Sequence, residues 1–161
     1  MDRAELDEAV WTLHVPLLRL AMSILRHPQN AEDAVSQAVV TAYTKLDTLR
    51  NPEALRPWLM KITARCCYDQ LRRRRREVLS DTVPEVALPF EEPLEGTLFA
   101  RLRQLPDGQA QVLLLYYYEG FSTAEIGRIL GLSRPTVSMR LKRGRARLRE
   151  WLEEETYHED I

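Results

Sequence analysis

Two runs of basic side chains are the strongest candidates for a functional site in this sequence. Residues 61–76 carry seven lysine or arginine side chains and one acid, and the run closes with five consecutive arginines. Residues 134–149 carry seven basic side chains and no acid. Guanidinium groups donate paired hydrogen bonds to phosphate oxygens, so both runs predict phosphate binding. The formal net charge of -1 hides this segregation, because residues 77–95 and 150–160 each carry six acids.

Other kinds of site chemistry find little support in the sequence. The two cysteines, Cys66 and Cys67, are adjacent, and neighbouring side chains on a helix point apart. The three histidines (His14, His27 and His158) lack the spacing of metal ligands. We find no nucleophile–base arrangement and no glycine loop that could cradle a phosphate. The sequence therefore predicts a protein that is not an enzyme and that needs neither a metal nor a cofactor.

Composition indicates the kind of chain that must position these basic runs. It has 161 residues, 45% of them apolar and 29% charged, which suits one domain or two small ones. Only six residues are glycine, which favours helix. The longest apolar run, residues 112–118, is too short to span a bilayer, and the acidic start does not resemble a signal peptide. We expect a cytoplasmic protein without membrane insertion.

The first half of the chain predicts three amphipathic helices in one bundle. The first helix should be kinked or broken at Pro16. The second should be capped by Asn30, with Asp33 favouring its positive end. The third should begin near Trp58, bury Leu59 and run into the arginines. Apolar residues of the second helix recur at spacings of three and four: Val35, Ala38, Val39, Ala42, Tyr43 and Leu46.

The second half predicts an extended linker and then another helical bundle. Residues 77–95 are acidic, contain three prolines and show no clean period. Residues 105–121 read as a core helix that is apolar nearly all round. Ser122 and Glu125 form a capping box for the next helix, and Gly131 should end it. Ser133 should then cap the last helix.

A helix, a short turn with glycine and a second helix form the outline of a helix-turn-helix. The inner stripe of the last helix is predicted to comprise Val137, Leu141, Leu148 and Leu152, with Gly144 at a close approach. The first turns of such a helix meet base edges in the major groove. The predicted base-reading residues are Arg134, Ser138, Met139, Lys142 and Arg143. The predicted phosphate contacts are Arg140, Arg145 and Arg147. The alternative is a solvated basic helix end.

The ordered set of motifs resembles a known family. "AEDAVSQAVVTAY" and "WLMKITARCCYDQLRRRRR", followed by a linker and a helix-turn-helix, resemble RNA polymerase sigma factors of the extracytoplasmic-function group within the sigma-70 family. The resemblance implies an all-α fold of two small helical bundles joined by an extended linker. Region 2 would span residues 1–76, the linker residues 77–95, and region 4 with an acidic tail residues 96–161.

The resemblance also implies a docking face for core RNA polymerase on the second helix. In the family this helix binds a coiled coil of the polymerase clamp. The polymerase-binding residues would be Asp33, Ser36, Gln37, Val40 and Thr41. Val40 offers a hint of its own, because it is apolar among polar neighbours on the face opposite the stripe. The alternative is an isolated surface valine.

The third helix and the loop before it match the part of the family that opens the −10 element. Residues 49–55 match a loop that captures a flipped base, and Cys66 stands where asparagine is common. The predicted −10 residues are Arg50, Asn51, Glu53, Ala54, Arg65, Arg72, Arg73 and Arg74. The five consecutive arginines would lie along duplex phosphates beside the bubble. A nuclear-import tag and a solvated face are the alternatives.

These expectations combine into one functional hypothesis. The chain would be a sigma factor, monomeric when free, that binds the clamp coiled coil and the flap of core polymerase. It would place its second bundle on the −35 element of promoter DNA and open the −10 element with its first. An anti-sigma factor is a further possible partner. The alternative is a stand-alone helix-turn-helix regulator whose N-terminal bundle senses a signal.

Overall fold

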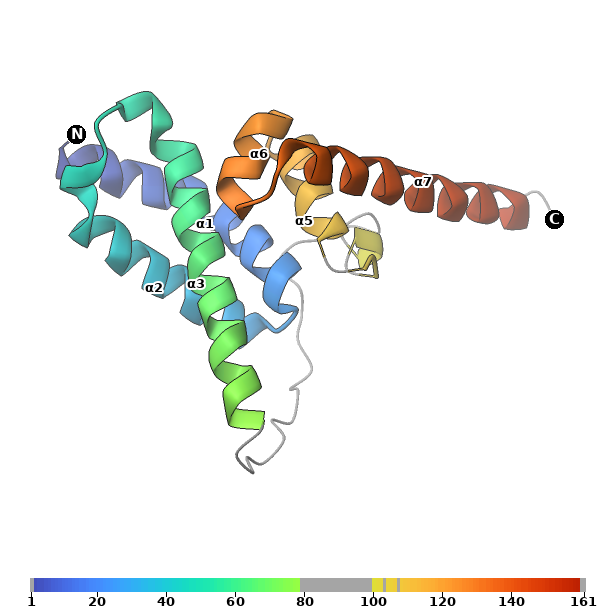
Figure 1. Ribbon diagram of the computed structural model, residues 1–161, viewed down its shortest axis with the longest axis horizontal. Helices are drawn as coiled ribbons and strands as arrows, with labels where there is room; N and C mark the ends of the chain where they lie inside the picture. The colour runs from blue at the N-terminus through green and yellow to red at the C-terminus, as the bar shows by residue number, and fades with distance from the viewer. Residues whose placement is uncertain (1, 79–99, 103, 107, 160–161) are drawn as a thin grey trace. The chain divides into compact units, whose positions relative to one another are not determined.

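The chain folds into two compact helical units, which are described separately. The computed structural model describes residues 2–78, 100–102, 104–106 and 108–159, and its two units are Met1–Leu94 and Glu95–Ile161. Every regular element within these residues is helical (Figure 1). The all-α class with two helical bundles is therefore confirmed. The predicted linker, apart from the residues up to 78, lies outside the described part of the chain.

Unit 1 is a bundle of three long helices: α1 (Arg3–Leu25), α2 (Pro28–Thr44) and α3 (Leu55–Val78). Each helix packs against the other two. An Asp2–Glu5 capping box starts α1. Leucine, methionine and alanine fill the core, and its largest fully buried side chains are Leu6, Leu17, Leu20, Met22, Leu59 and Met60.

Helix α1 runs through Pro16 as one continuous helix, so of the two outcomes expected there the break does not occur. One predicted helix boundary in unit 1 is wrong. Helix α2 begins at Pro28, not at Asn30, and His27 caps it by accepting a hydrogen bond from the Asn30 N–H at 3.3 Å. Proline is favoured at the first helical position because its missing N–H would have no partner there. Asn30 is buried inside the first turn instead, and its carbonyl accepts from Gln70 Nε2 at 3.3 Å.

The predicted stripe of α2 is buried only in part. Val35, Ala38 and Ala42 are buried, whereas Val39, Tyr43 and Leu46 are half-buried. The Tyr43 hydroxyl donates to the Asp7 carboxylate, and the Arg3 guanidinium lies 5.5 Å from the centre of its ring. Tyr43 therefore stays at the bundle edge, where it ties α2 to the start of α1.

Two short 3-10 turns lead from α2 to α3: η1 (Leu46–Thr48) and η2 (Pro52–Ala54). Helix α3 begins at Leu55, three residues before the position expected from the sequence, and runs to Val78. The last two residues of this helix extend past the boundary expected at residue 76. Leu59 is buried as predicted, and Ile62 is buried as well; Cys67 is fully buried while Cys66 is half-buried.

By length and composition, α1 would be long and apolar enough to cross a bilayer. Eight of its residues are buried inside unit 1, from Leu6 to Ile24. These buried residues of α1 form part of the core of the bundle.

Unit 2 contains a short helical stretch at residues 100–102, then α5 (Gln109–Leu113), the π-helical turn η3 (Leu114–Tyr118), α6 (Thr123–Leu130) and α7 (Arg134–Glu159). The capping predictions are confirmed. Ser122 and Glu125 form both bonds of the box, Gly131 ends α6 with a φ of 70°, and Ser133 precedes α7 and accepts from the Thr136 N–H at 3.4 Å.

Two expectations about apolar positions in unit 2 are wrong. The helix predicted over residues 105–121 covers only Gln109–Tyr118 and is not buried all round, because Tyr116, Tyr117 and Tyr118 are 38%, 55% and 40% exposed. The tyrosines lie in the π turn, where the Glu119 N–H bonds the Leu114 carbonyl five residues back. Leu152 is 60% exposed, because the second half of α7 extends beyond α5 and α6 (Figure 1).

Candidate nucleic-acid and polymerase interfaces

The turn between α6 and α7 holds the first turns of α7 in a fixed position. The Leu132 N–H donates to the Gly127 carbonyl at 2.9 Å. A Cβ at Gly127 would lie 2.7 Å from the Leu132 carbonyl oxygen, so only glycine allows this approach. On α7, Val137 and Leu141 are 0% and 2% exposed and anchor the helix from inside. A Cβ at Gly144 would lie 2.7 Å from Leu113 Cδ1, which confirms the predicted close packing at this glycine.

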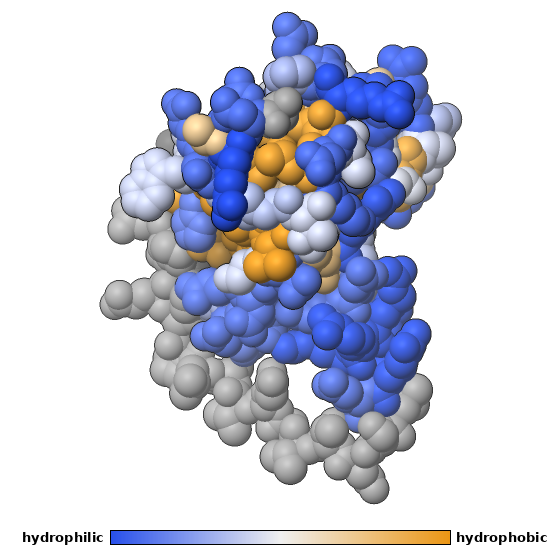
Figure 2. Space-filling view, turned by 90° about the vertical axis from the view of Figure 1, so that its left-hand side faces the viewer, coloured by the Kyte–Doolittle hydropathy of each residue, from blue (hydrophilic) through white to orange (hydrophobic). Residues whose placement is uncertain are grey.

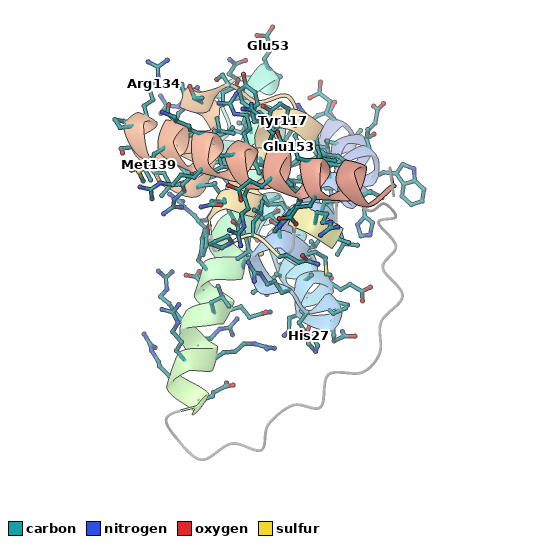
Figure 3. The ribbon with its side chains drawn as sticks, turned by 90° about the vertical axis from the view of Figure 1, so that its right-hand side faces the viewer. His27, Glu53, Tyr117, Arg134, Met139 and Glu153 are labelled. Carbon is teal, nitrogen blue, oxygen red and sulfur yellow. The ribbon has the colours of Figure 1, made fainter. Side chains whose placement is uncertain are left out.

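The structure brings the predicted base-reading residues together on the outside of α7. Arg134, Ser138 and Lys142 are all exposed and follow one line at spacings of four, and exposed Met139 and Arg143 form the adjacent line. Figure 3 shows Arg134 and Met139 projecting outward from the first part of the helix. The five side chains combine cations, a hydroxyl and a thioether. Such a mixed surface can distinguish base pairs by hydrogen bonds and by apolar contact.

The predicted phosphate contacts on α7 have internal contacts as well. Arg140 is half-buried, and its guanidinium occupies the space beside Gly108. Arg145 Nε donates to the Leu141 carbonyl at 3.4 Å. The Arg147 guanidinium lies 5.7 Å from the centre of the Trp151 ring, which Arg101 also approaches at 5.5 Å. These arginines are therefore less free to follow a ligand than the residues of the first turns.

In unit 1, a groove of about 590 Å³ lies between α2 and α3. We call it the α2–α3 groove. Its lining comprises Gln37, Thr41, Lys45, Ile62, Arg65, Cys66, Asp69, Arg72, Arg73 and Arg76. The groove is thus lined both by residues predicted to bind polymerase and by residues predicted to bind DNA. The sequence predicts these two sets on separate surfaces.

Five residues of the α2–α3 groove are absent from the predicted sites: Lys45, Ile62, Cys66, Asp69 and Arg76. On α3 the lining residues follow one another at spacings of three, one and three, which is the pattern of a single helix face. That signal was present in the sequence. Asp69 is paired with Arg72, but both side chains are more than half exposed, so the pair contributes little to stability.

Cys66 lies in the α2–α3 groove, while its neighbour Cys67 is fully buried in the core. Burial is the main cause that raises the pKa of the Cys66 thiol, and the Asp69 carboxylate raises it further; Thr41 and nearby cations act in the opposite direction. The Cys66 side chain is therefore a neutral thiol at pH 7. The described residues hold no cluster of three or more potential metal-ligating side chains.

The expected polymerase face of α2 is exposed. Val40 is 61% exposed, and Ser36, Gln37 and Asp33 beside it are exposed too, while Thr41 is half-buried. Gln29 Nε2 donates to Asp33 at 3.2 Å. An apolar side chain thus stands free among polar ones, as the sequence predicted.

The loop before α3 presents three of its four predicted residues to solvent. Arg50, Asn51 and Glu53 are exposed, and Ala54 is half-buried. The Asn51 side-chain oxygen accepts from the Glu53 N–H at 3.1 Å and so shapes η2. Figure 3 shows the Glu53 carboxylate pointing away from the loop. Hydrophobic side chains gather on the end of unit 1 that carries η1 and η2, surrounded by hydrophilic ones (Figure 2).

Unit 2 has an apolar groove of about 360 Å³ that the sequence did not predict. Its lining comprises Leu102, Leu113, Tyr117, Tyr118, Arg145, Leu148, Arg149 and Leu152. Two of its tyrosines, Tyr117 and Tyr118, belong to the π turn and were expected in the core. An exposed apolar groove beside arginines is typical of a surface that binds another protein.

Comparisons with known proteins agree with these two units. The sigma-70 region 2 family matches residues 11–77, and the sigma-70 region 4 family matches residues 96–148. The "ECF RNA polymerase sigma factor SigM" of Mycobacterium tuberculosis is 30% identical over 150 residues, which cover 91% of this chain and 76% of the relative. The "Probable RNA polymerase sigma factor RfaY" of Xanthomonas campestris is 32% identical over 83% of this chain and 36% of its own length.

A solved structure shows the same arrangement of elements. The sigma factor RpoE of Bartonella quintana, crystallised with the anti-sigma factor NepR, matches with a TM-score of 0.75 and 27% identity. The match covers 91% of this chain and 96% of RpoE. The chain therefore belongs to the extracytoplasmic-function sigma factors of the sigma-70 family, which bind core RNA polymerase and promoter DNA and direct promoter-specific initiation of transcription.

Proposed function

We propose that the two basic surfaces of this sigma factor divide promoter recognition between them. The first turns of α7 read the −35 element through Arg134, Ser138, Met139, Lys142 and Arg143, and Arg140 contacts the flanking phosphates. The observation that carries this proposal is the exposed, chemically mixed set of side chains on α7, held by the α6–α7 turn. Such side chains read base edges, whereas uniform charge reads only the backbone.

Unit 1 would then hold and open the −10 element. Arg50, Asn51, Glu53 and Ala54 lie on one loop, and the first three are exposed, so an unstacked base could reach them. Extruding a base costs a few kcal/mol, and a surface that binds the base offsets that cost, so strand opening needs no ATP. Arg65, Arg72, Arg73 and Arg74 supply positive charge along α3 for the adjacent phosphates.

Core polymerase would be bound through both units. The exposed face of α2 with Asp33, Ser36, Gln37, Val40 and Thr41 is the proposed contact for the clamp coiled coil. The apolar groove of unit 2 is the proposed contact for the flap, because its exposed tyrosines and Leu152 offer apolar area on an otherwise charged unit. An anti-sigma factor is a further proposed partner, since the similar RpoE was crystallised with one.

The chain would act without catalytic chemistry of its own, as a monomer when free, in the cytoplasm where polymerase and promoter DNA meet. Its contribution is to bind and position, while the polymerase makes the RNA. This part of the proposal rests on the class of protein to which the chain belongs.

Two measurements on the full chain test this function. The chain should co-purify with bacterial core polymerase and should then support run-off transcription from a promoter library. A stand-alone helix-turn-helix regulator would instead bind an operator tightly without polymerase. Binding of that kind, with no initiation on addition of polymerase, would contradict the proposal.

A further inference from the structure

Met139 is a large apolar side chain on a face of α7 that is otherwise polar and cationic. Of the α7 side chains that the structure describes, the large apolar ones that are exposed are Met139 and Leu152, at 43% and 60%. Leu152 lines the apolar groove of unit 2. Met139 lies instead among the proposed base-reading residues, and Figure 3 shows it projecting outward from the helix. Its exposure is therefore a feature of the base-reading face.

Pro135 and Arg143 lie one turn before and one turn after Met139. Spacings of four put the three residues on one line along α7, and all three are exposed. A proline ring, a thioether and a guanidinium thus follow one another along the helix. The methionine side chain is unbranched and polarisable, so it adapts to an irregular apolar partner. The first part of the line offers apolar contact, and its end offers hydrogen bonds.

The fold holds Met139 at the surface. Val137 and Leu141, two residues to either side, are 0% and 2% exposed and anchor this stretch of α7 in unit 2. Before it, the Ser133 side-chain oxygen accepts from the Thr136 N–H at 3.4 Å and caps the helix. Because the backbone is fixed on both sides, the thioether does not withdraw into the core. It meets water in the free protein and DNA in the complex.

The major groove of DNA offers one kind of apolar group to such a side chain. The edges of guanine, adenine and cytosine present hydrogen-bond donors and acceptors, whereas thymine also presents its C5-methyl group. 5-Methylcytosine carries the same group on the same ring carbon. A thioether against a polar base edge would leave donors or acceptors without a partner, which is unfavourable. Met139 therefore gains most by covering a pyrimidine methyl group.

We propose that Met139 reads the C5-methyl group of one pyrimidine in the −35 element, with Pro135 extending the apolar contact. The inference rests on the proposed function, because it requires α7 to enter the major groove of that element. It adds the identity of a base and a route of regulation. The base is thymine, or 5-methylcytosine in its place, so methylation of a cytosine there would strengthen binding.

Replacement of thymine by deoxyuridine tests the contact, because it removes the methyl group and leaves the pairing edge unchanged. Holoenzyme assembled from the full chain and core polymerase first selects duplexes from a library with a randomised −35 element. Each thymine of the selected element is then replaced singly. Competition binding should find one thymine whose replacement lowers affinity about fourfold, the factor expected for one buried methyl group.

The same position tests the second source of the methyl group. With a C·G pair in place of the T·A pair, 5-methylcytosine should bind about fourfold more tightly than cytosine. A methyl effect with both bases supports the proposal for both sources. An effect with thymine alone supports it and assigns thymine.

A matched pair of variants assigns the effect to Met139. Met139→Gln keeps the length of the side chain but makes it polar, and it should reduce the deoxyuridine effect to a factor near one. Met139→Leu keeps an apolar side chain and should preserve most of the effect. A full effect in Met139→Gln would overturn the proposal, because another side chain would then sense the methyl group. Equal loss in both variants would contradict an apolar contact.

The selection step separates this inference from the proposed function. A clear preference at the −35 element, with no thymine in it or with no deoxyuridine effect, would reject the methyl contact and leave the proposed function standing. No preference at the −35 element would reject the proposed function itself.

Discussion

The second half of α3 and the first turns of α7 are both strongly basic, yet they are built differently. On α3 the exposed residues from 72 to 76 are all arginines, and only those on one helix face line the α2–α3 groove. On α7 the five exposed base-reading candidates are of four types, and a capped turn and two glycines hold the helix in place. Equal charge therefore does not mean equal function.

The difference indicates which surface supplies specificity. A surface made of arginines alone binds any phosphate backbone, and its affinity depends strongly on the salt concentration. A mixed set on a fixed helix gives different energies for different bases. We infer that α7 chooses the promoter and that α3 strengthens binding wherever α7 has placed the protein.

Gly127→Val should have the greatest effect, because it disturbs the turn that holds α7 in position. Gly127→Val puts side-chain atoms against the Leu132 carbonyl oxygen, where even a Cβ would lie at 2.7 Å. Because the obstacle is backbone, unit 2 should lose about 3 kcal/mol of unfolding free energy, at the upper end of overpacking costs. Thermal denaturation followed by circular dichroism measures this loss.

Ala146→Val is the control for that variant, because it adds the same side chain at an exposed position of α7. It should cost only about 0.6 kcal/mol, the difference in helix propensity. Equal losses in the two variants would show that the α6–α7 turn does not depend on a glycine.

The second prediction concerns base recognition by α7. Arg143→Ala should lower the preference for one base pair of the −35 element by about 2 kcal/mol, or roughly thirtyfold, because a bidentate base contact is lost. Arg147→Ala, one turn further and already beside Trp151, should change affinity without changing that preference. Competition binding of holoenzyme to DNA duplexes with a randomised −35 element measures the affinity and the base preference of both variants. A uniform loss for Arg143→Ala would place that residue on phosphate.

The third prediction concerns α3. Replacing Arg72 and Arg73 together by glutamine should make the plot of log affinity against log salt shallower by about 1.5, since each phosphate contact contributes roughly 0.7–0.9. Lys61→Gln, on the same helix but outside the α2–α3 groove, should leave the slope nearly unchanged. An unchanged slope in the double variant would remove these two arginines from the DNA surface.

The smallest effect concerns the edge of unit 1. The hydrogen bond to the Asp7 carboxylate is the main cause that raises the pKa of Tyr43 above its usual value of 10.0, and burial adds to it. Asp7→Asn should lower that pKa and cost about 1 kcal/mol of unfolding free energy near neutral pH. NMR of labelled tyrosine rings during an alkaline titration measures the shift.

The same pair sets a pH dependence. Because the pKa of Tyr43 is higher in the folded chain than in the unfolded one, its contribution to stability is complete below pH 10 and is lost as the pH rises through the folded pKa. The difference in stability between wild type and Asp7→Asn should therefore shrink at strongly alkaline pH. A constant difference would argue against the bond.

Much of the fold could be predicted because the signals were local. The Ser122–Glu125 box, Gly131 and the helical spacing of Val35, Ala38 and Ala42 each specify structure within a few residues. The errors came from competition between signals. At the start of α2, Pro28 offered a better first residue than the one after Asn30.

The sites were predictable to the extent that they lie on one helix. The exposed face at the start of α7 follows from spacing alone. The two grooves do not, because each needs two or more elements to be packed before it exists. The apolar groove also includes two tyrosines of a π turn, and a pattern with the ordinary helical period conceals such a turn.

The most direct test of the separate roles of α7 and α3 is run-off transcription from one pooled promoter library. It compares the wild type with Arg143→Ala and with the Arg72/Arg73 double variant. The account predicts that Arg143→Ala reorders the promoters, while the Arg72/Arg73 double variant lowers all of them by a similar factor. It would be contradicted if the double variant reordered the promoters and the Arg143 variant scaled them evenly.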